Sequence, residues 1–122
     1  MVKDYKELDV FIRCRELVKL VYQVSATFPS SEIYGLTNQY RRCGVSVLSN
    51  ISEGIGRHTI KDTIHFMHIS RGSLYELEAQ TIIAFDLKYI DSLNYNLLIE
   101  KIEACKRLLN GFIKYQRSLE KN

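Results

Sequence analysis

The last quarter of the chain repeats mostly apolar residues at alternating intervals of four and three positions. This spacing places the repeated side chains on one side of an α-helix, in a heptad-like seam. A helix with such a seam is expected to pack nearly antiparallel to a neighbouring helix. The seam consists of Leu98, Ile102, Cys105, Leu109, Phe112, Gln116 and Leu119.

A second helical pattern runs from about Leu8 to Phe28 and carries two apolar stripes on neighbouring faces. A helix that is apolar over so much of its circumference needs two contact surfaces. We expect Pro29 to end this helix, because proline lacks an amide hydrogen and disfavours the α conformation in the residue before it. One stripe comprises Phe11, Cys14, Val18, Val21, Ser25 and Phe28, and the other Val10, Leu17 and Val24.

Two further helices are predicted between these segments. Thr37 is a candidate N-cap for the first of them, which we expect to end at Gly54 and Gly56. Thr59, with Asp62 three positions later, resembles a capping signal for a long helix that ends near 87. The inward positions of the first are predicted to be Tyr40, Cys43 or Gly44, Val47, Ile51 and Ile55.

Small residues mark the centre of the long third helix. Ser70, Gly72 and Ser73 are expected to let another helix approach closely. Asp91 or Ser92 is expected to cap the fourth helix.

Four helices joined by short loops favour an all-α, antiparallel, up-and-down four-helix bundle. The chain has 122 residues, which suits a single domain over residues 1–122. One proline and six glycines supply too little turn chemistry for a β-sandwich.

Composition narrows the function classes. A net charge of +3 permits nucleic-acid binding without requiring it. The N-terminus has no apolar signal core, and no stretch approaches the roughly 18 apolar residues of a membrane span, so we expect a cytoplasmic protein. Cys14, Cys43 and Cys105 fall within apolar-periodic segments and are expected to be reduced, buried and inert.

Catalytic and metal-binding patterns are weak. His65 and His68 could share a helix face with Asp62, but no glutamate is followed three residues later by histidine, as in di-metal bundles. The turn from Gly54 to Arg57 lacks the full glycine fingerprint of a nucleotide loop, so helix termination is the preferred interpretation. We therefore expect no enzyme, metal or cofactor.

A row of polar residues at intervals of four, four and three lies within the second helix. It would form either a buried hydrogen-bonded network or a functional surface, and the network is favoured because buried polar groups must be paired. The row consists of Arg42, Ser46, Asn50 and Glu53.

Basic residues recur along the end of the fourth helix. Such a stripe can follow a phosphate backbone, although a solvated helix face is the more common role of such charges. The stripe comprises Arg107, Asn110, Lys114, Arg117 and Lys121, and Arg41 and Arg57 complete the candidate nucleic-acid-binding residues.

The middle of the chain resembles the 23S rRNA intervening-sequence proteins, also called the S23 or four-helix-bundle family. Four elements of that family's signature appear in order, and the resemblance extends across nearly the whole chain. Leu48 stands where a proline is usual, which should leave the second helix straighter, and Cys43, Gly44 and Ser52 replace small residues. The matching segments are Phe28 to Leu36, Gln39 to Arg42, Asn50 to Arg57 and Gly72 to Glu78.

This resemblance implies a bundle that assembles into a cyclic homopentamer. A distant branch of the family serves as the accessory protein of a reverse transcriptase, whereas ordinary members have no established biochemical activity. Our leading hypothesis is a non-enzymatic homo-oligomer that binds RNA or another nucleic acid. It is motivated by the doubled apolar stripe of the first helix and the basic stripe of the fourth. The alternative is an interaction scaffold that docks a partner enzyme such as a reverse transcriptase.

Overall fold

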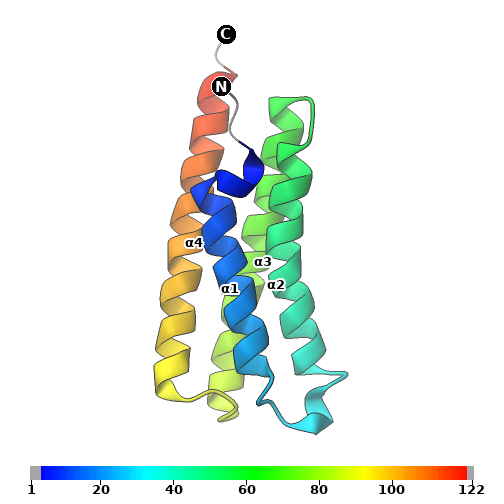
Figure 1. Ribbon diagram of the computed structural model, residues 1–122, viewed down its shortest axis with the longest axis vertical. Helices are drawn as coiled ribbons and strands as arrows, with labels where there is room; N and C mark the ends of the chain where they lie inside the picture. Colours follow the sequence, from blue (N-terminus) through cyan, green and yellow to red (C-terminus); the bar gives the residue numbers. More distant parts are fainter. Residues whose placement is uncertain (1–3, 121–122) are drawn as a thin grey trace.

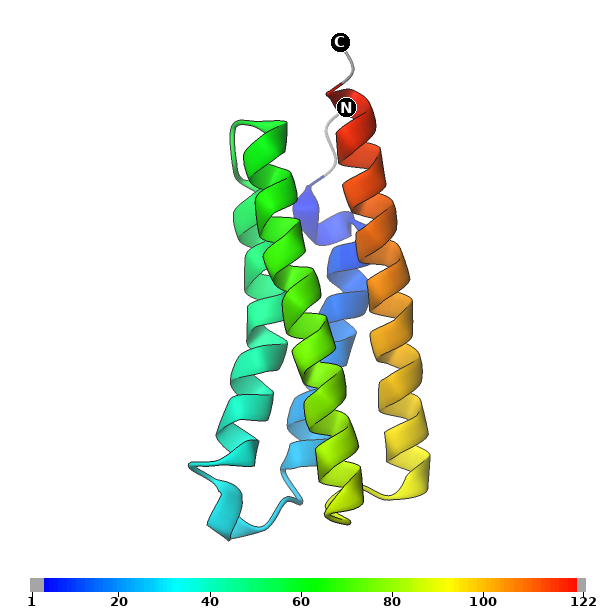
Figure 2. The ribbon, with the colours of Figure 1, turned by 180° about the vertical axis from the view of Figure 1, so that it is seen from behind.

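The structure is a computed structural model that describes residues 4–120. Consecutive helices run in opposite directions, and each of the first and third helices packs against the second and fourth (Figure 1). Figure 2 shows α3 in front, between α2 and α4. The all-α four-helix prediction is confirmed, and residues 4–120 contain no strand. The elements are the 3-10 turns η1 (Tyr5–Glu7) and η2 (Ser30–Glu32) and the helices α1 (Asp9–Ser25), α2 (Leu36–Ile55), α3 (Ile60–Asp86) and α4 (Ser92–Leu119).

Helix α1 uses both of its apolar stripes inside the bundle. Cys14, Leu17 and Val21 are fully buried, and the two contact surfaces that the sequence demanded are α2 and α4. The doubled stripe is therefore satisfied within one chain and gives no evidence for a second copy. The helix ends at Ser25, three residues before the predicted end, and Phe28 continues as a turn whose amide bonds to the carbonyl of Ser25.

Helix α2 begins differently from the prediction. Its N-cap is Gly35, and Thr37 is buried rather than capping. The carboxylate of Glu32 in η2 instead accepts a hydrogen bond from the amide of Leu36 at 3.1 Å, so a residue from the preceding turn satisfies a free helical donor. The helix is continuous through Leu48, and the predicted end at Gly54 and Gly56 is confirmed within one residue.

Small residues bring α2 and α3 together. The hydroxyl of Ser70 donates to the carbonyl of Val47 at 2.7 Å, and the thiol of Cys43 donates to the carbonyl of Ser73 at 3.1 Å. Gly72 was predicted to share this role, but nothing lies within 4 Å of the position of an added Cβ. At about 3.6 residues per turn, Ser70 and Ser73 share a face that Gly72 does not.

The closest approach of these two helices lies near the end of α2. A Cβ added at Gly54 would lie 2.5 Å from Cε of Met67 and 2.8 Å from Cβ of Phe66. The hydroxyl of Thr63 donates to the carbonyl of Gly54 at 2.8 Å. This position of α2 therefore requires glycine for steric reasons.

The caps of α3 and α4 agree with the sequence. The side chain of Thr59 accepts from the amide of Asp62, and that of Asp91 accepts from the amide of Asn94. Both caps satisfy a free N-terminal amide of their helix.

The seam of α4 is buried at its first four positions and then shifts. Ile113 is buried in place of Phe112, which is half-buried, and Leu119 is exposed. A strict seven-residue repeat drifts by about 20° per heptad on a straight helix, which accounts for the shift. The end of α4 also extends beyond the start of α1, so no α1 residue covers it (Figure 1). Within residues 4–120, no helix is long and apolar enough to cross a bilayer.

Candidate nucleic-acid interface

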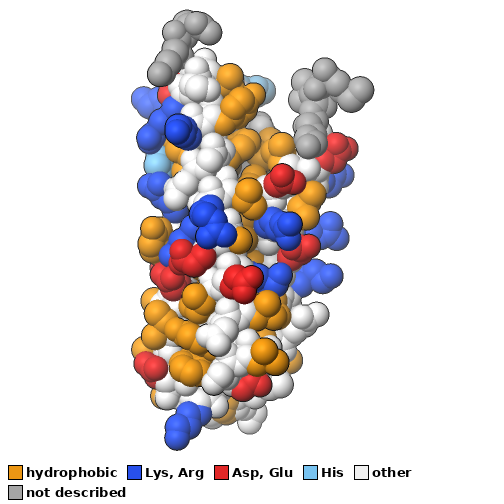
Figure 3. All heavy atoms as spheres, turned by 90° about the vertical axis from the view of Figure 1, so that its left-hand side faces the viewer, with side chains coloured by type: hydrophobic (Ala, Val, Ile, Leu, Met, Phe, Trp, Pro, Cys, Tyr) orange, Lys and Arg blue, Asp and Glu red, His pale blue; other side chains and the backbone are white. Residues whose placement is uncertain are grey.

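The basic stripe of α4 is exposed as predicted. Arg107, Lys114 and Arg117 are all exposed on the second half of the helix, whereas Lys121 lies outside the described residues. Figure 3 views the bundle from the α4 side and shows Lys and Arg side chains gathered toward one upper edge, above a band of mixed charge. In the lower part of this face, hydrophobic side chains lie among uncharged ones and scattered charged ones (Figure 3).

Helix α3 adds two residues that the sequence did not assign to this surface. Nη1 of Arg71 donates to Oδ1 of Asn110 at 3.0 Å, which joins the helices. Nη2 of the same arginine lies 3.0 Å from Nδ1 of His68, and Nη2 of Arg117 lies 3.1 Å from Nε2 of that imidazole. His68 is thus held between arginines from two helices. We call His68, Arg71, Asn110, Lys114 and Arg117 the basic face.

The basic face carries an excess of positive charge. Within residues 4–120, no carboxylate forms an ion pair with Arg71, Lys114 or Arg117. Partial burial lowers the pKa of His68 below 6.5, and the neighbouring guanidinium groups of Arg71 and Arg117 lower it further, with a smaller contribution from His65. The surface therefore favours an anion.

Toward the middle of the bundle, the basic face ends at a cluster of charged residues between α3 and α4. Nζ of the buried Lys106 lies 2.9 Å from a carboxylate oxygen of Glu78 and 3.0 Å from one of Glu103. It also lies 4.1 Å from the ring centroid of Tyr75. Burial opposes the charge of Lys106, but the two carboxylates prevail and raise its pKa. This lysine is paired, in contrast to the cations of the basic face.

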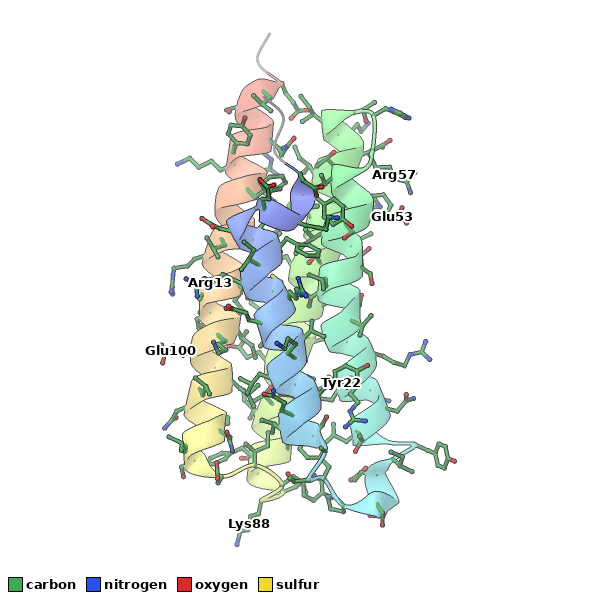
Figure 4. The ribbon with its side chains drawn as sticks, in the orientation of Figure 1. Arg13, Tyr22, Glu53, Arg57, Lys88 and Glu100 are labelled. Atoms are coloured by element: carbon green, nitrogen blue, oxygen red, sulfur yellow. The ribbon has the colours of Figure 1, made fainter. Side chains whose placement is uncertain are left out.

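Arg41 and Arg57 do not join this surface. Nε of Arg41 donates to the hydroxyl of Ser25 at 2.8 Å, and its guanidinium lies 4.9 Å from the ring centroid of Tyr22. Arg57 lies 3.6 Å from Glu53 and 4.6 Å from the ring centroid of Phe66, toward the end of the bundle opposite to Tyr22 and Arg41 (Figure 4). The structure therefore divides the predicted nucleic-acid-binding residues among separate places.

The predicted polar network of α2 is only partly formed. Nδ2 of Asn50 donates to the carbonyl and hydroxyl of Ser46, and that hydroxyl lies 3.0 Å from the hydroxyl of Ser73. Arg42 and Glu53 are exposed, and Glu53 pairs with a residue outside the row. The prediction of one buried four-residue network is wrong, because the row lies on the flank of α2, where Ser46 alone bonds to α3 and Asn50 bonds back to Ser46.

Polar residues of this row also line a shallow groove between α2 and α3. Arg42, Ser46 and Ser73 contribute to it together with Glu76 and Gln80. Oε1 of Gln80 is buried and has no hydrogen-bond partner among the described residues. The groove lies on a different side of α3 from the basic face.

The described residues offer little for metal or thiol chemistry. His65 is exposed and His68 faces two cations, and no group of three metal-ligating side chains occurs within residues 4–120. All three cysteines are free and buried, as expected. Burial raises the pKa of Cys43 to about 11, and the hydrogen bond with Cys105 together with burial raises that of Cys14. Protonated thiols are poor nucleophiles. The hydrogen bond with Cys14 lowers the pKa of Cys105, whereas burial opposes this change.

Comparison with known proteins finds the same fold in a solved structure. The crystal structure of a protein with unknown function from the S23 ribosomal protein family, from Bacteroides thetaiotaomicron VPI-5482, matches this fold with a TM-score of 0.77. The chains are 20% identical, and the match covers 86% of this chain and 98% of the other. The comparison with curated proteins found no similar sequence.

The sequence motifs are confirmed by the match to a family profile. Residues 6–111 match the family described as 23S rRNA-intervening sequence protein. This range contains all four helices except the last turns of α4. The chain therefore belongs to the 23S rRNA-intervening sequence protein family.

Proposed function

We propose that this chain is a non-enzymatic, homo-oligomeric protein that binds nucleic acid, with RNA as the preferred ligand, through the basic face. The observation that carries the proposal is the convergence of Arg71, Lys114 and Arg117 from two helices without a paired carboxylate in residues 4–120. When an unpaired Lys or Arg contacts a phosphate, the nucleic acid releases the counterion that neutralised that phosphate. This release drives binding.

Assembly would strengthen such a surface. The family resemblance implies a cyclic homopentamer, in which one basic face per subunit repeats around the ring. Several weak patches on one ring act together, because each contact raises the effective concentration of the next. Light scattering at micromolar concentration tests the assembly: a mass near five times 14.2 kDa is expected, and a monomer would contradict the ring.

Binding to single-stranded RNA at two salt concentrations tests the nucleic-acid function. The wild-type protein should bind at 50 mM salt and lose much of its affinity at 200 mM, since released counterions make binding salt-dependent. Replacing Arg71, Lys114 and Arg117 together with alanine should abolish measurable binding at 200 mM salt. No affinity at low salt, or unchanged affinity in the triple variant, would overturn the proposal.

The second candidate is a scaffold that docks a partner protein, for example a reverse transcriptase. Exposed apolar side chains at the loop end of the bundle favour it. Tyr34 is 93% exposed and Leu93 is 79% exposed, and Ile33 and Leu87 are each half exposed at the same end. A stoichiometric protein partner that is recovered after nuclease treatment would support this function over RNA binding.

A further inference from the structure

The imidazole of His68 has an arginine at each of its two ring nitrogens. Nη2 of Arg71 lies 3.0 Å from Nδ1, and Nη2 of Arg117 lies 3.1 Å from Nε2. The first arginine comes from α3 and the second from α4, so the geometry depends on the packing of the two helices. Asn110 fixes Arg71 from the other side through a 3.0 Å hydrogen bond.

These three side chains have more hydrogen-bond donors than acceptors. A guanidinium has five donors and no acceptor, and a neutral imidazole has one of each. Whichever nitrogen of His68 carries the proton, an N–H of the ring faces an N–H of one arginine. Protonation of the ring makes both contacts donor to donor. Within the cluster, donors therefore outnumber acceptors in every protonation state, and the remaining donors face solvent at this half-exposed position.

A negatively charged acceptor fits these donors better than water does. The charged and titratable groups around His68 are Arg71 and His65 from α3 and Arg117 from α4, and none of them is acidic. An oxyanion would accept from both guanidinium groups and from the ring at once. Arginine forks match the oxygen spacing of phosphate, and such charge-assisted bonds are about twice as strong as neutral ones.

We propose that His68, Arg71 and Arg117 form a binding site for one backbone phosphate of a bound nucleic acid, with Asn110 positioning Arg71. The site rests on the proposed function and deepens it, because it assigns a single phosphate to three named side chains. Protonation of His68 adds a donor and a charge toward that phosphate, so the site binds more tightly at low pH.

Sulfate is a suitable probe, because its charge is constant between pH 5.5 and 8. We expect sulfate to shift the imidazole NMR signals of His68 saturably and to raise its measured pKa. His58 is exposed, lies outside this cluster and serves as an internal control in the same spectrum. Equal shifts of His58 and His68, or no shift of His68, would overturn the site.

Variants separate the role of the fork from that of charge. Arg71→Gln should weaken sulfate binding about tenfold, which corresponds to about 1.4 kcal/mol for one charge-assisted hydrogen bond. Arg71→Lys keeps the charge and should recover only part of the affinity, since lysine lacks the planar fork. Arg15→Gln on the exposed side of α1 should have no effect. Full recovery in Arg71→Lys would contradict the fork geometry.

A single-stranded oligoribonucleotide distinguishes the phosphate site from the wider function. The expected result is that it shifts the His68 signals as sulfate does, whether or not it carries a 5′-phosphate. RNA binding that leaves His68 unshifted would overturn the site and leave the proposed function standing. Sulfate binding without RNA binding would overturn the nucleic-acid function. A response only to a 5′-phosphate would overturn the assignment to a backbone phosphate.

Discussion

Helix α3 contacts α2 and α4 through two very different interfaces. Toward α2 it presents small side chains whose polar atoms are paired at short range, as in the 2.7 Å hydrogen bond from Ser70 to the carbonyl of Val47. Toward α4 it presents long charged side chains that meet near the surface, including Arg71 and Glu78. At the centre of the first interface the small polar side chains are paired, as at Ser70 and Cys43, whereas the second interface keeps arginine donors without an acidic partner among residues 4–120. The proposed binding surface therefore lies on the α4 side of α3, away from its close contact with α2.

The largest loss of stability is expected from adding a side chain where α2 and α3 approach each other most closely. Gly54→Ala places a Cβ 2.8 Å from Cβ of Phe66 and 3.1 Å from the carbonyl oxygen of Thr63, which cannot move easily. We expect a loss of about 3 kcal/mol in the free energy of unfolding, in the range of overpacked cores. Urea unfolding measures it.

Gly72→Ala on the same pair of helices is the matched control. Its Cβ meets nothing within 4 Å, so the better helix propensity of alanine should raise stability by about 1 kcal/mol. If the two alanine variants changed the free energy of unfolding equally, the close approach at Gly54 would not be what limits the residue at that position.

A smaller loss of stability is expected at the centre of the α3–α4 interface. Lys106→Met removes the cation that Glu78 and Glu103 share, and it leaves two partly exposed carboxylates close together. We expect a loss of about 2 kcal/mol, below the values for fully buried pairs because solvent screens the glutamates. Lys114→Met, at an exposed position, should change stability by less than about 0.5 kcal/mol. If Lys106→Met left the free energy of unfolding unchanged, packing alone would hold these helices together.

The smallest effect is a pH dependence at His68. Because its pKa is lowered in the folded state, the unfolded chain binds this proton more readily. The contribution of neutral His68 to the free energy of unfolding is therefore fully present above pH 6.5. It is lost as the pH falls from there toward the lower pKa of the folded state. His68→Gln should flatten the decline of stability below pH 6.5, whereas His65→Gln should retain it. Thermal unfolding from pH 7.5 to 5 compares them, and identical slopes would contradict the lowered pKa.

Local signals in the sequence predicted most of the fold. Thr59 and Asp91 cap their helices as expected, because capping depends on residues within one turn. The prediction of Thr37 as the N-cap of α2 was wrong. Glu32, in a turn that the sequence pattern did not reveal, accepts the hydrogen bond from the first amide of the helix instead. The burial of Lys106 was also missed, because a polar residue beside an apolar seam gives no sign of the carboxylates across the interface.

The candidate site was only half predictable. The α4 stripe repeats along one helix and is visible as a pattern, but Arg71 and His68 reach it from positions 39 and 49 residues away from their partners. Their spacing of three residues places them on one face of α3, which was the available signal. Only packing shows that this face turns toward α4. Arg41 and Arg57, conversely, looked equivalent in sequence but bond to other side chains at opposite ends.

The salt dependence of single-stranded RNA affinity tests the central claim most directly. Each neutralised phosphate contributes a slope of about 0.7 to the fall of log K with log salt. Replacing Arg71, Lys114 and Arg117 together with glutamine should reduce the slope by about 2. The same change of charge at Arg13, Arg15 and Lys19, all exposed on α1, should leave it nearly unchanged. Equal reductions in both variants would contradict an interface on the basic face.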